Sequence, residues 1–320
     1  MTTALFAVPL LLAGACSPGS TNTACRPLGT VQASSPNPAF AGTVFMIVME
    51  NHGVGDILDD KENGAHYVQS LAAQYTVARG YTDPFVHPSE PNYLWMAAGE
   101  NFGILDDNPP IDHHIASTSH IADQLERAGL GWHAYMESMG DPCKLTAAYP
   151  YDPKHNPFVY FDDINGWNGT AFLPSARCTN NDIDYSHFAT DLAAGTLPKF
   201  VFITPNLIDD MHDGTIAQGD QWLAQEIPRI QASPQYQNGG VLFLLWDEGS
   251  LSIGDDPPLL VISPLAKKGF VSHTAYTTSS LLKTEETIMG VEPLPCDPGY
   301  QSVPTMDDVF TVPLTQVAAK

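Results

Sequence analysis

The chain has 320 residues, of which 43% are hydrophobic, so it is long enough to bury a large core and does not have the composition of a disordered chain. It contains 13 Lys and Arg residues against 36 Asp and Glu residues, and the resulting net charge of −23 would repel a nucleic-acid backbone. These numbers argue against nucleic-acid binding and favour one large α/β domain that attracts cations.

The first 16 residues predict an export signal. An apolar run over residues 4–15 is too short to span a bilayer and ends in small residues before Cys16. The segment approximates a bacterial lipoprotein processing site, with one extra residue between Leu12 and Cys16 and no Lys or Arg ahead of the run. The product would be secreted, periplasmic or anchored to a membrane by a lipid on Cys16. Residues 17–42 predict a flexible tether, and residues 43–320 a folded domain.

Short apolar runs alternate with helical patterns along the folded domain. Buried strands are predicted over residues 43–49, 199–204, 241–246 and 259–263, and helices over residues 66–75, 119–128, 218–230 and 279–289. Such alternation predicts an α/β fold in which helices cover both faces of a mostly parallel sheet. Ligands of these sheets bind at the carboxyl ends of the strands.

Ser89 precedes a helix-forming run over residues 93–98 and has two interpretations. Ser is preferred immediately before a helix, and Pro91 suits a first helical position, so Ser89 would only cap the helix. The same position directs backbone N–H groups and the positive helix end at an anion, so Ser89 would instead hold a phosphate. Asn92 would donate hydrogen bonds to a phosphoryl oxygen or serve as a polar residue of the first turn.

Polar side chains follow the predicted strands. Glu50 and Asn51 come after the first strand, and Asp247 and Glu248 after the third. Asp and Asn also favour turns, but several such clusters at one sheet edge favour a site. These oxygen donors suit one divalent cation (Mg²⁺, Mn²⁺, Ca²⁺ or Zn²⁺), with Ser89 as a further ligand and as the nucleophile.

Two histidines stand in polar, loop-like contexts. His155 and His212 are predicted to bind phosphate or to protonate a leaving alcohol. Asp210 and Asp213 are placed on the substrate-binding side, where either would fix the tautomer of His212 or remain a solvated turn residue. No function is assigned to four other histidines, His87, His113, His114 and His120.

The chain has five cysteines. With Cys16 lipidated, the other four form an even set that can make two disulfides in an oxidising compartment, in any of three pairings. We expect Cys143 with Cys178, closing an irregular aromatic-rich segment, and Cys25 with Cys296, joining the two ends of the chain. The spacings do not match a structural zinc site.

Five ordered segments carry a family resemblance: FMIVMENHGVGDIL, HPSEPNYLWMAAGENFGI, KHNPFVYFDDI, FVFITPNLIDDMHDGT and LLWDEG. They resemble the signature blocks of the bacterial and fungal phosphoesterase family, which contains secreted acid phosphatases and phospholipases C within the alkaline phosphatase superfamily. The similarity covers residues 43–290 and is greatest to secreted acid phosphatases of the mycobacterial type. It implies an alkaline-phosphatase-like three-layer α/β/α sandwich, with residues 43–320 as the catalytic domain.

The resemblance also implies roles for particular residues. Ser89 would be the nucleophile, with His155 and His212 around the phosphoryl group, and one divalent metal ion would be held by Glu50, Asn51, Ser89, Asp247 and Glu248. Many members carry a histidine where this chain has Thr278, and His273 lies five residues earlier, so a third site histidine is not expected.

The function expected from these residues is metal-dependent hydrolysis of a small phosphate monoester, as by an acid phosphatase, through a phosphoserine. The first alternative is a phosphodiesterase of the phospholipase C type. The second is a catalytically silent, metal-binding surface lipoprotein. No protein partner is inferred.

Overall fold

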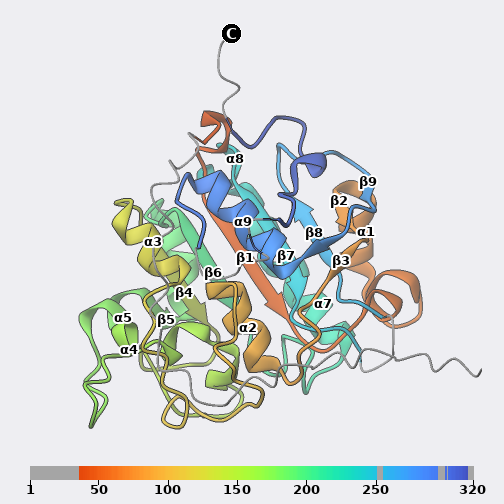
Figure 1. Cartoon of the computed structure of the whole chain (residues 1–320). Helices are drawn as coiled ribbons and strands as arrows, with labels where there is room; N and C mark the ends of the chain where they lie inside the picture. Colours follow the sequence, from red (N-terminus) through yellow and green to blue (C-terminus); the bar gives the residue numbers. More distant parts are fainter. Residues whose placement is uncertain (1–35, 251–254, 295–299, 301, 316–320) are drawn as a thin grey trace, which may run out of the picture.

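The computed structural model describes residues 36–250, 255–294, 300 and 302–315. An eight-stranded sheet runs through the molecule in the order β5-β4-β6-β1-β7-β8-β2-β9 (Figure 1), and β10 and β3 pair separately. The strands are β1 (Val44–Met49), β2 (Thr76–Ala78), β3 (Tyr81–Thr82), β4 (Trp132–Met136), β5 (Asp182–Asp184), β6 (Phe200–Thr204), β7 (Val241–Trp246), β8 (Leu259–Ile262), β9 (Phe270–Ser272) and β10 (Tyr276–Thr277).

Helices cover both faces of the sheet. Helices α2 (Ser89–Ala98), α3 (Ile121–Arg127) and α9 (Thr278–Met289) pack on one face, with α2 and α9 in front of the sheet in Figure 1. The other face carries α1 (His66–Gln74), α6 (Phe188–Ala194) and α7 (Ile216–Ala232). Short helices lie in the connections: α4 (Asp162–Asn165), α5 (Ala176–Asn181), α8 (Pro234–Gln237), η1 (Pro38–Phe40), η2 (Gly55–Asp59), η3 (Pro153–His155), η4 (Pro157–Tyr160), η5 (Tyr185–His187) and η6 (Asp307–Val309).

Strand β1 is apolar throughout because both of its faces are buried. All six of its residues are buried, and alternate side chains enter opposite cores: Val44, Met46 and Val48 in one, Phe45, Ile47 and Met49 in the other. The three-layer α/β/α sandwich with a mostly parallel sheet is therefore confirmed. Strand β8 alone in this sheet runs against its neighbours.

The predicted strands and helices all form. Strands β1, β6, β7 and β8 lie within one residue of their predicted limits, and helices α1, α3, α7 and α9 within two. Strand β4 was not predicted, because His133 interrupts an otherwise apolar run, yet it pairs with β5 on one side and β6 on the other.

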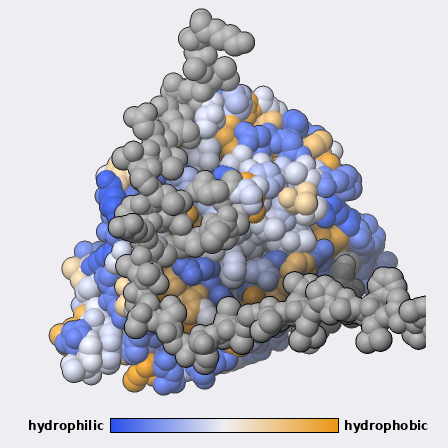
Figure 2. Space-filling view, in the orientation of Figure 1, coloured by the Kyte–Doolittle hydropathy of each residue, from blue (hydrophilic) through white to orange (hydrophobic). Residues whose placement is uncertain are grey.

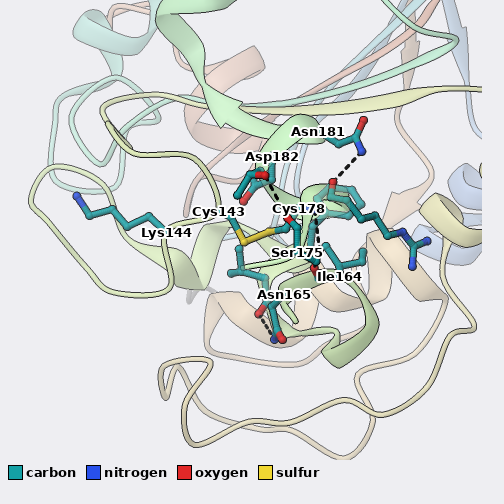
Figure 3. Close-up of a disulfide and its surroundings, with 12 residues drawn as sticks. Cys143, Lys144, Ile164, Asn165, Ser175, Cys178, Asn181 and Asp182 are labelled. Atoms are coloured by element: carbon teal, nitrogen blue, oxygen red, sulfur yellow. Dashed lines mark hydrogen bonds between the residues drawn. A yellow bond between two sulfur atoms is a disulfide. The ribbon is translucent and has the colours of Figure 1, made fainter. Parts of the chain in front are cut away.

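A disulfide joins Cys143 and Cys178, which confirms one predicted pair (Figure 3). The backbone N–H of Cys143 donates to the carbonyl of Asp182, and the Asn156 side-chain amide donates to both carboxylate oxygens of Asp182, each at 3.0 Å. The segment closed by the disulfide is therefore tied to β5 close to His155. The other predicted pair, Cys25 and Cys296, lies outside the described residues.

The packed part of the chain begins before the predicted tether boundary at residue 43. Pro36 forms a β-bridge with Thr315, and Phe40 is buried in the core. Lys199 Nζ donates to the carbonyls of Phe40 and Gly42 at 2.6 Å, which fixes this segment to β6. A flexible tether over residues 36–42 is therefore wrong. The signal segment, Cys16 and the tether up to residue 35 lie outside the described residues.

The visible surface is mainly polar. Figure 2 shows a largely hydrophilic face on which apolar side chains form small, separate patches. Within the described ranges, no helix is both long enough and apolar enough to cross a lipid bilayer.

Candidate active site

Ser89 is the first residue of α2. The N-cap position belongs to Pro88, whose side chain makes no capping bond. The Ser89 hydroxyl is buried and donates to Glu50 Oε2 at 3.0 Å. The interpretation of Ser89 as a helix cap is therefore wrong: its hydroxyl faces the end of β1 instead.

The ends of β1 and β7 meet beside this serine. Glu50 follows β1 directly, is fully buried, and its backbone N–H donates to the carbonyl of Asp210 at 2.9 Å. Asn51 adopts a left-handed backbone conformation, φ 58°, which Asn tolerates better than most residues. This turn directs the Asn51 N–H to Asp247 Oδ1 at 3.2 Å. Glu50 and Asp247 are thus brought together from strands that are neighbours in the sheet.

These carboxylates are buried without full compensation. Glu50 Oε1 and Asp247 Oδ2 have no hydrogen-bond partner among the described residues. Burial raises the pKa of Glu50 well above its ordinary value, and the charges of Asp247 and Asp210 raise it further. Burial, followed by the charge of Glu248, raises the pKa of Asp247 in the same way. Because an unpaired buried carboxylate is costly, this group fits a bound divalent cation.

Glu248 lies at the same edge. Its Oε2 atom is 2.7 Å from His87 Nδ1 and accepts a hydrogen bond from Asn92 Nδ2 at 3.0 Å. Burial is the main cause that raises the pKa of Glu248 to about 7, although the charge of His87 lowers it.

His155 lies between Glu50 and Asp210. Its Nδ1 atom bonds Asp210 Oδ2 at 3.1 Å, and its Nε2 atom lies 3.1 Å from Glu50 Oε1 without hydrogen-bonding geometry. The ring stacks on Tyr93, with centroids 5.1 Å apart. Burial, with the Lys154 charge second, holds the pKa of His155 well below its ordinary value. His155 Nε2 is therefore a third buried polar atom without a hydrogen-bond partner among the described residues, beside Glu50 Oε1 and Asp247 Oδ2.

His212 completes the histidine pair. Its ring centroid lies 5.5 Å from that of His155, and its Nδ1 atom bonds Asp213 Oδ1 at 2.8 Å. Ligand atoms of Glu50, His155 and His212 lie within 4.8 Å of one another, an arrangement that can also hold a metal ion. The site thus offers two overlapping ligand sets that share Glu50.

Three predicted substrate-binding residues have other contacts. Asp210 is fully buried; it bonds the His155 ring and accepts the backbone N–H of His212 at 2.7 Å. Asp213 contacts the ring of His212. Asn92 Nδ2 donates to the carbonyl of Val86 at 2.7 Å and to Glu248 Oε2 at 3.0 Å. The two aspartates position the histidines.

Lys154 and Asp107 were not predicted. Lys154 Nζ lies 3.1 Å from His212 Nε2 and 3.2 Å from Asp107 Oδ2, and Asp107 Oδ1 accepts the N–H of Glu90 in the first turn of α2. Burial lowers the pKa of Lys154, but the charges of Asp107 and Glu50 outweigh it and the net shift is upward. The position of Lys154 next to His155 was the available signal; nothing in the sequence around Asp107 indicated its contacts.

Thr278 is the first residue of α9. Its hydroxyl hydrogen-bonds the hydroxyl of Tyr81 at 3.0 Å, and both side chains are buried. His273 is exposed before β10.

Solved structures share this fold. A protein of the alkaline phosphatase superfamily from Vibrio parahaemolyticus aligns with a TM-score of 0.53 and 10% identity, covering 85% of this chain and 74% of the other. A phosphonate monoester hydrolase from Silicibacter pomeroyi aligns with a TM-score of 0.55 and 13% identity, covering 83% and 76%. These neighbours show that the chain has the fold found in the alkaline phosphatase superfamily.

Sequence comparison identifies the family. The chain belongs to the phosphoesterase family, whose model matches residues 60–292. It is 29% identical to a phosphatidylinositol-3-phosphatase of Mycobacterium tuberculosis, over 81% of this chain and 80% of the relative. It is 30% identical to an acid phosphatase of Aspergillus fumigatus, over 78% of this chain. The match spans only 55% of that fungal enzyme.

Proposed function

We propose that the chain is a metal-dependent phosphomonoester hydrolase that acts through a phosphoserine on Ser89. The observation that carries this proposal is the buried Ser89 hydroxyl at the start of α2, 3.0 Å from Glu50. A serine there faces both the positive helix end and a cluster suited to a cation. The names of the mycobacterial and fungal relatives, a phosphatidylinositol-3-phosphatase and acid phosphatases, favour a monoester substrate.

One divalent ion fits the residues of the site. Its proposed ligands are the oxygen donors Glu50, Asn51, Ser89, Asp247 and Glu248, and the uncompensated oxygens of Glu50 and Asp247 support this choice. When bound, the ion would neutralise these carboxylates and stabilise negative charge on the serine and the phosphoryl group. Mg²⁺, Mn²⁺, Ca²⁺ and Zn²⁺ all accept such ligands.

The reaction has two steps, and the protein's own side chains move the protons in both. The Ser89 oxygen attacks phosphorus as its proton moves to Glu50, and the bond from phosphorus to the alcohol oxygen breaks. His212 is partly exposed beside the buried His155, and it gives a proton to the departing alcohol when both of its ring nitrogens are protonated. Water then attacks the phosphoserine and passes a proton to His212, phosphate is released, and Glu50 returns its proton to the Ser89 oxygen. Asp210 and Asp213 hold the two imidazoles in orientation.

A phosphodiesterase is the second candidate. A non-hemolytic phospholipase C of Burkholderia pseudomallei is 22% identical over 68% of this chain, although the match spans only 39% of that enzyme. The same serine and carboxylates would serve a diester, so the substrate preference needs measurement.

The deciding experiment is an assay of the purified chain with para-nitrophenyl phosphate, its bis-ester and phosphatidylcholine. We expect the monoester to be preferred. Activity should disappear after exhaustive EDTA treatment and return on addition of one of Mg²⁺, Mn²⁺, Ca²⁺ or Zn²⁺. Preference for either diester would transfer the proposal to the second candidate. A calorimetric metal titration of Asp247→Asn and His155→Gln separates the two ligand sets, because only the first variant should lose binding if the oxygen donors hold the ion.

We also propose that the protein is exported, with a lipid on Cys16 as its membrane attachment. The apolar run before Cys16 and the disulfide between Cys143 and Cys178 support this proposal, because disulfides persist in oxidising compartments. Cell fractionation of the wild type and Cys16→Ala tests it. We expect the wild type in the membrane fraction and Cys16→Ala outside it. A wild-type protein found only in the soluble fraction would rule the anchor out.

A further inference from the structure

Lys154 places an ammonium group inside the candidate site. It lies in η3 one residue before His155, and its side chain is only 14% exposed. The ammonium contacts Asp107 Oδ2 at 3.2 Å and His212 Nε2 at 3.1 Å. A lysine ammonium has three hydrogens, so these two contacts leave one for a phosphoryl oxygen.

The contact between Lys154 and His212 also indicates which nitrogen of the His212 ring carries the proton. His212 Nδ1 faces the Asp213 carboxylate, an acceptor, so Nδ1 carries the ring proton and Nε2 accepts from Lys154. Lys154 is therefore the donor in this pair, and one ligand atom of His212 lies within 4.8 Å of a Glu50 carboxylate oxygen.

Charge gives Lys154 a role that a neutral residue could not fill. Carboxyl groups dominate the surroundings of Lys154, and Asp107, Glu50 and Asp152 all favour its charged form. A phosphate monoester carries about −1.5 to −2 charges at neutral pH, whereas a diester has one ionisable oxygen fewer and carries a single charge. A fixed cation near the phosphoryl group therefore favours monoesters over diesters.

We propose that Lys154 determines substrate class by binding the additional anionic oxygen of a phosphate monoester. This inference rests on the function proposed for the same site. Asp107 holds the ammonium in place and links it to the first turn of α2, the turn that begins at Ser89. The alternative role is structural, in which Lys154 only supports His212 and the Asp107 loop.

The test compares kcat/KM for para-nitrophenyl phosphate and for its bis-ester in the wild type, Lys154→Met and Lys154→Arg. Lys144→Met is the matched control, because Lys144 Nζ donates to the backbone carbonyl of Met139 and its side chain extends away from the disulfide in Figure 3. We expect Lys154→Met to lower the monoester value by at least about 30-fold, and the diester value by less than about threefold. Lys154→Arg should recover most of the monoester activity, and Lys144→Met should match the wild type.

A binding measurement gives a second readout. Calorimetric titration of inorganic phosphate should show weaker binding to Lys154→Met by a factor comparable to the monoester loss. Equal losses on the two esters, or unchanged phosphate affinity, would overturn the proposal. If Lys154→Met does not fold, as judged by thermal unfolding, Lys154→Gln gives the same comparison. A wild type that hydrolyses neither ester removes the proposed function, while the phosphate titration still tests the role of Lys154.

Discussion

Ser89 is subject to two opposing electrostatic effects. The start of α2 favours negative charge on its oxygen by about 0.3–2 kcal/mol. An ionised Glu50 at 3.0 Å opposes that charge by roughly 5 kcal/mol at an effective dielectric constant of about 20. The helix end alone therefore cannot stabilise a serine alkoxide beside this carboxylate. A cation between the two groups, or a proton on Glu50, is required.

The first prediction follows from this geometry. Ser89→Ala should lower kcat for the preferred phosphate ester by at least ~10³-fold, because no other oxygen nucleophile takes its place at the start of α2. The measurement is steady-state turnover, with phosphoserine trapping by mass spectrometry after an acid quench.

Ser70→Ala is the control for this substitution, because Ser70 is exposed on α1 and its hydroxyl donates to the carbonyl of Tyr67. In urea denaturation, both variants should have a free energy of unfolding within about 1 kcal/mol of the wild-type value. Turnover by Ser89→Ala at the wild-type rate would exclude the serine from the mechanism.

At the scale of elements, α1 is capped by a residue of another helix. Its N-cap, Ala65, makes no side-chain bond, and the backbone N–H groups of Tyr67 and Val68 donate to the two carboxylate oxygens of Asp220 in α7, each at 2.9 Å. A negative charge at a helix N-terminus is favourable, and this one also joins two helices on the same face of the sheet.

The second prediction concerns this cap. Asp220→Ala should lower the free energy of unfolding by about 1–2 kcal/mol, because two backbone donors in the first turn of α1 lose their acceptor. Urea denaturation measures the change. Gln221→Ala, an exposed neighbour on α7, should differ from the wild type by less than about 0.5 kcal/mol. Equal stabilities of the two variants would refute the capping role.

The third prediction concerns the disulfide in Figure 3. Cys143 and Cys178 are separated by 35 residues, so their bond restricts a long loop of the unfolded chain. The double substitution to serine should cost about 4 kcal/mol of stability by the chain-entropy relation. Because the loop carries Lys154 and His155, hydrogen exchange should increase around η3 as well. Unchanged exchange there would show that the link through Asp182 and Asn156 holds the segment without the disulfide.

The sequence predicted elements best where the burial pattern was simple. Strand β1 is apolar throughout because both of its faces are covered, and its continuation into Glu50 and Asn51 pointed to the correct sheet edge. Strand β4 lies inside the sheet, but His133 interrupts its apolar run, and so it escaped prediction. The pattern of apolar residues within one segment does not show which other strands will pair with it on its two sides.

The site was predicted only in part for a related reason. Residues that follow strands are brought together by sheet topology, so Glu50 and Asp247 could be expected to meet. The contacts of Lys154, Asp107 and His87 depend on loops that approach the site from elsewhere. No spacing rule relates such loops to the sheet, because loop conformation follows from tertiary packing.

For the molecule as a whole, buried acids determine how stability depends on pH. Burial raises the pKa of Glu286 to about 8 and that of Asp182 to about 7, although amide groups donate hydrogen bonds to both. Burial lowers the pKa of Lys199 to about 8. The Asp59 and Asp308 carboxyl groups have lowered pKa values, Asp59 chiefly through its hydrogen bonds to Arg79, and Asp308 because hydrogen bonds from Ser272 and its neighbours outweigh burial.

These shifts act in different pH ranges. A carboxyl with a raised folded pKa binds more protons in the folded state, so its stabilisation is complete below the unfolded pKa and is lost as pH rises to the folded value. For Glu286 this range runs from about 4.5 to about 8. Asp59 and Asp308 act oppositely and lose their contribution below about 3.8. The lowered pKa of Lys199 makes stability rise with pH only above about 8. For these groups together, stability should be greatest near pH 4–5, and the lowered pKa of His155 opposes this trend below about 6.5.

The fourth prediction is that the free energy of unfolding falls between pH 5 and 7.5, by about 1.4 kcal/mol per pH unit for each such carboxyl. Glu286→Gln should reduce this slope, because a glutamine oxygen still accepts from Gln124 and the Leu294 N–H but has no proton to lose. The exposed Glu292→Gln should keep the wild-type slope. Urea unfolding at half-unit pH steps measures all three proteins. A wild-type stability that rises over this interval would mean that the buried acids are already ionised, and their hydrogen bonds would then have to outweigh the cost of burying their charge.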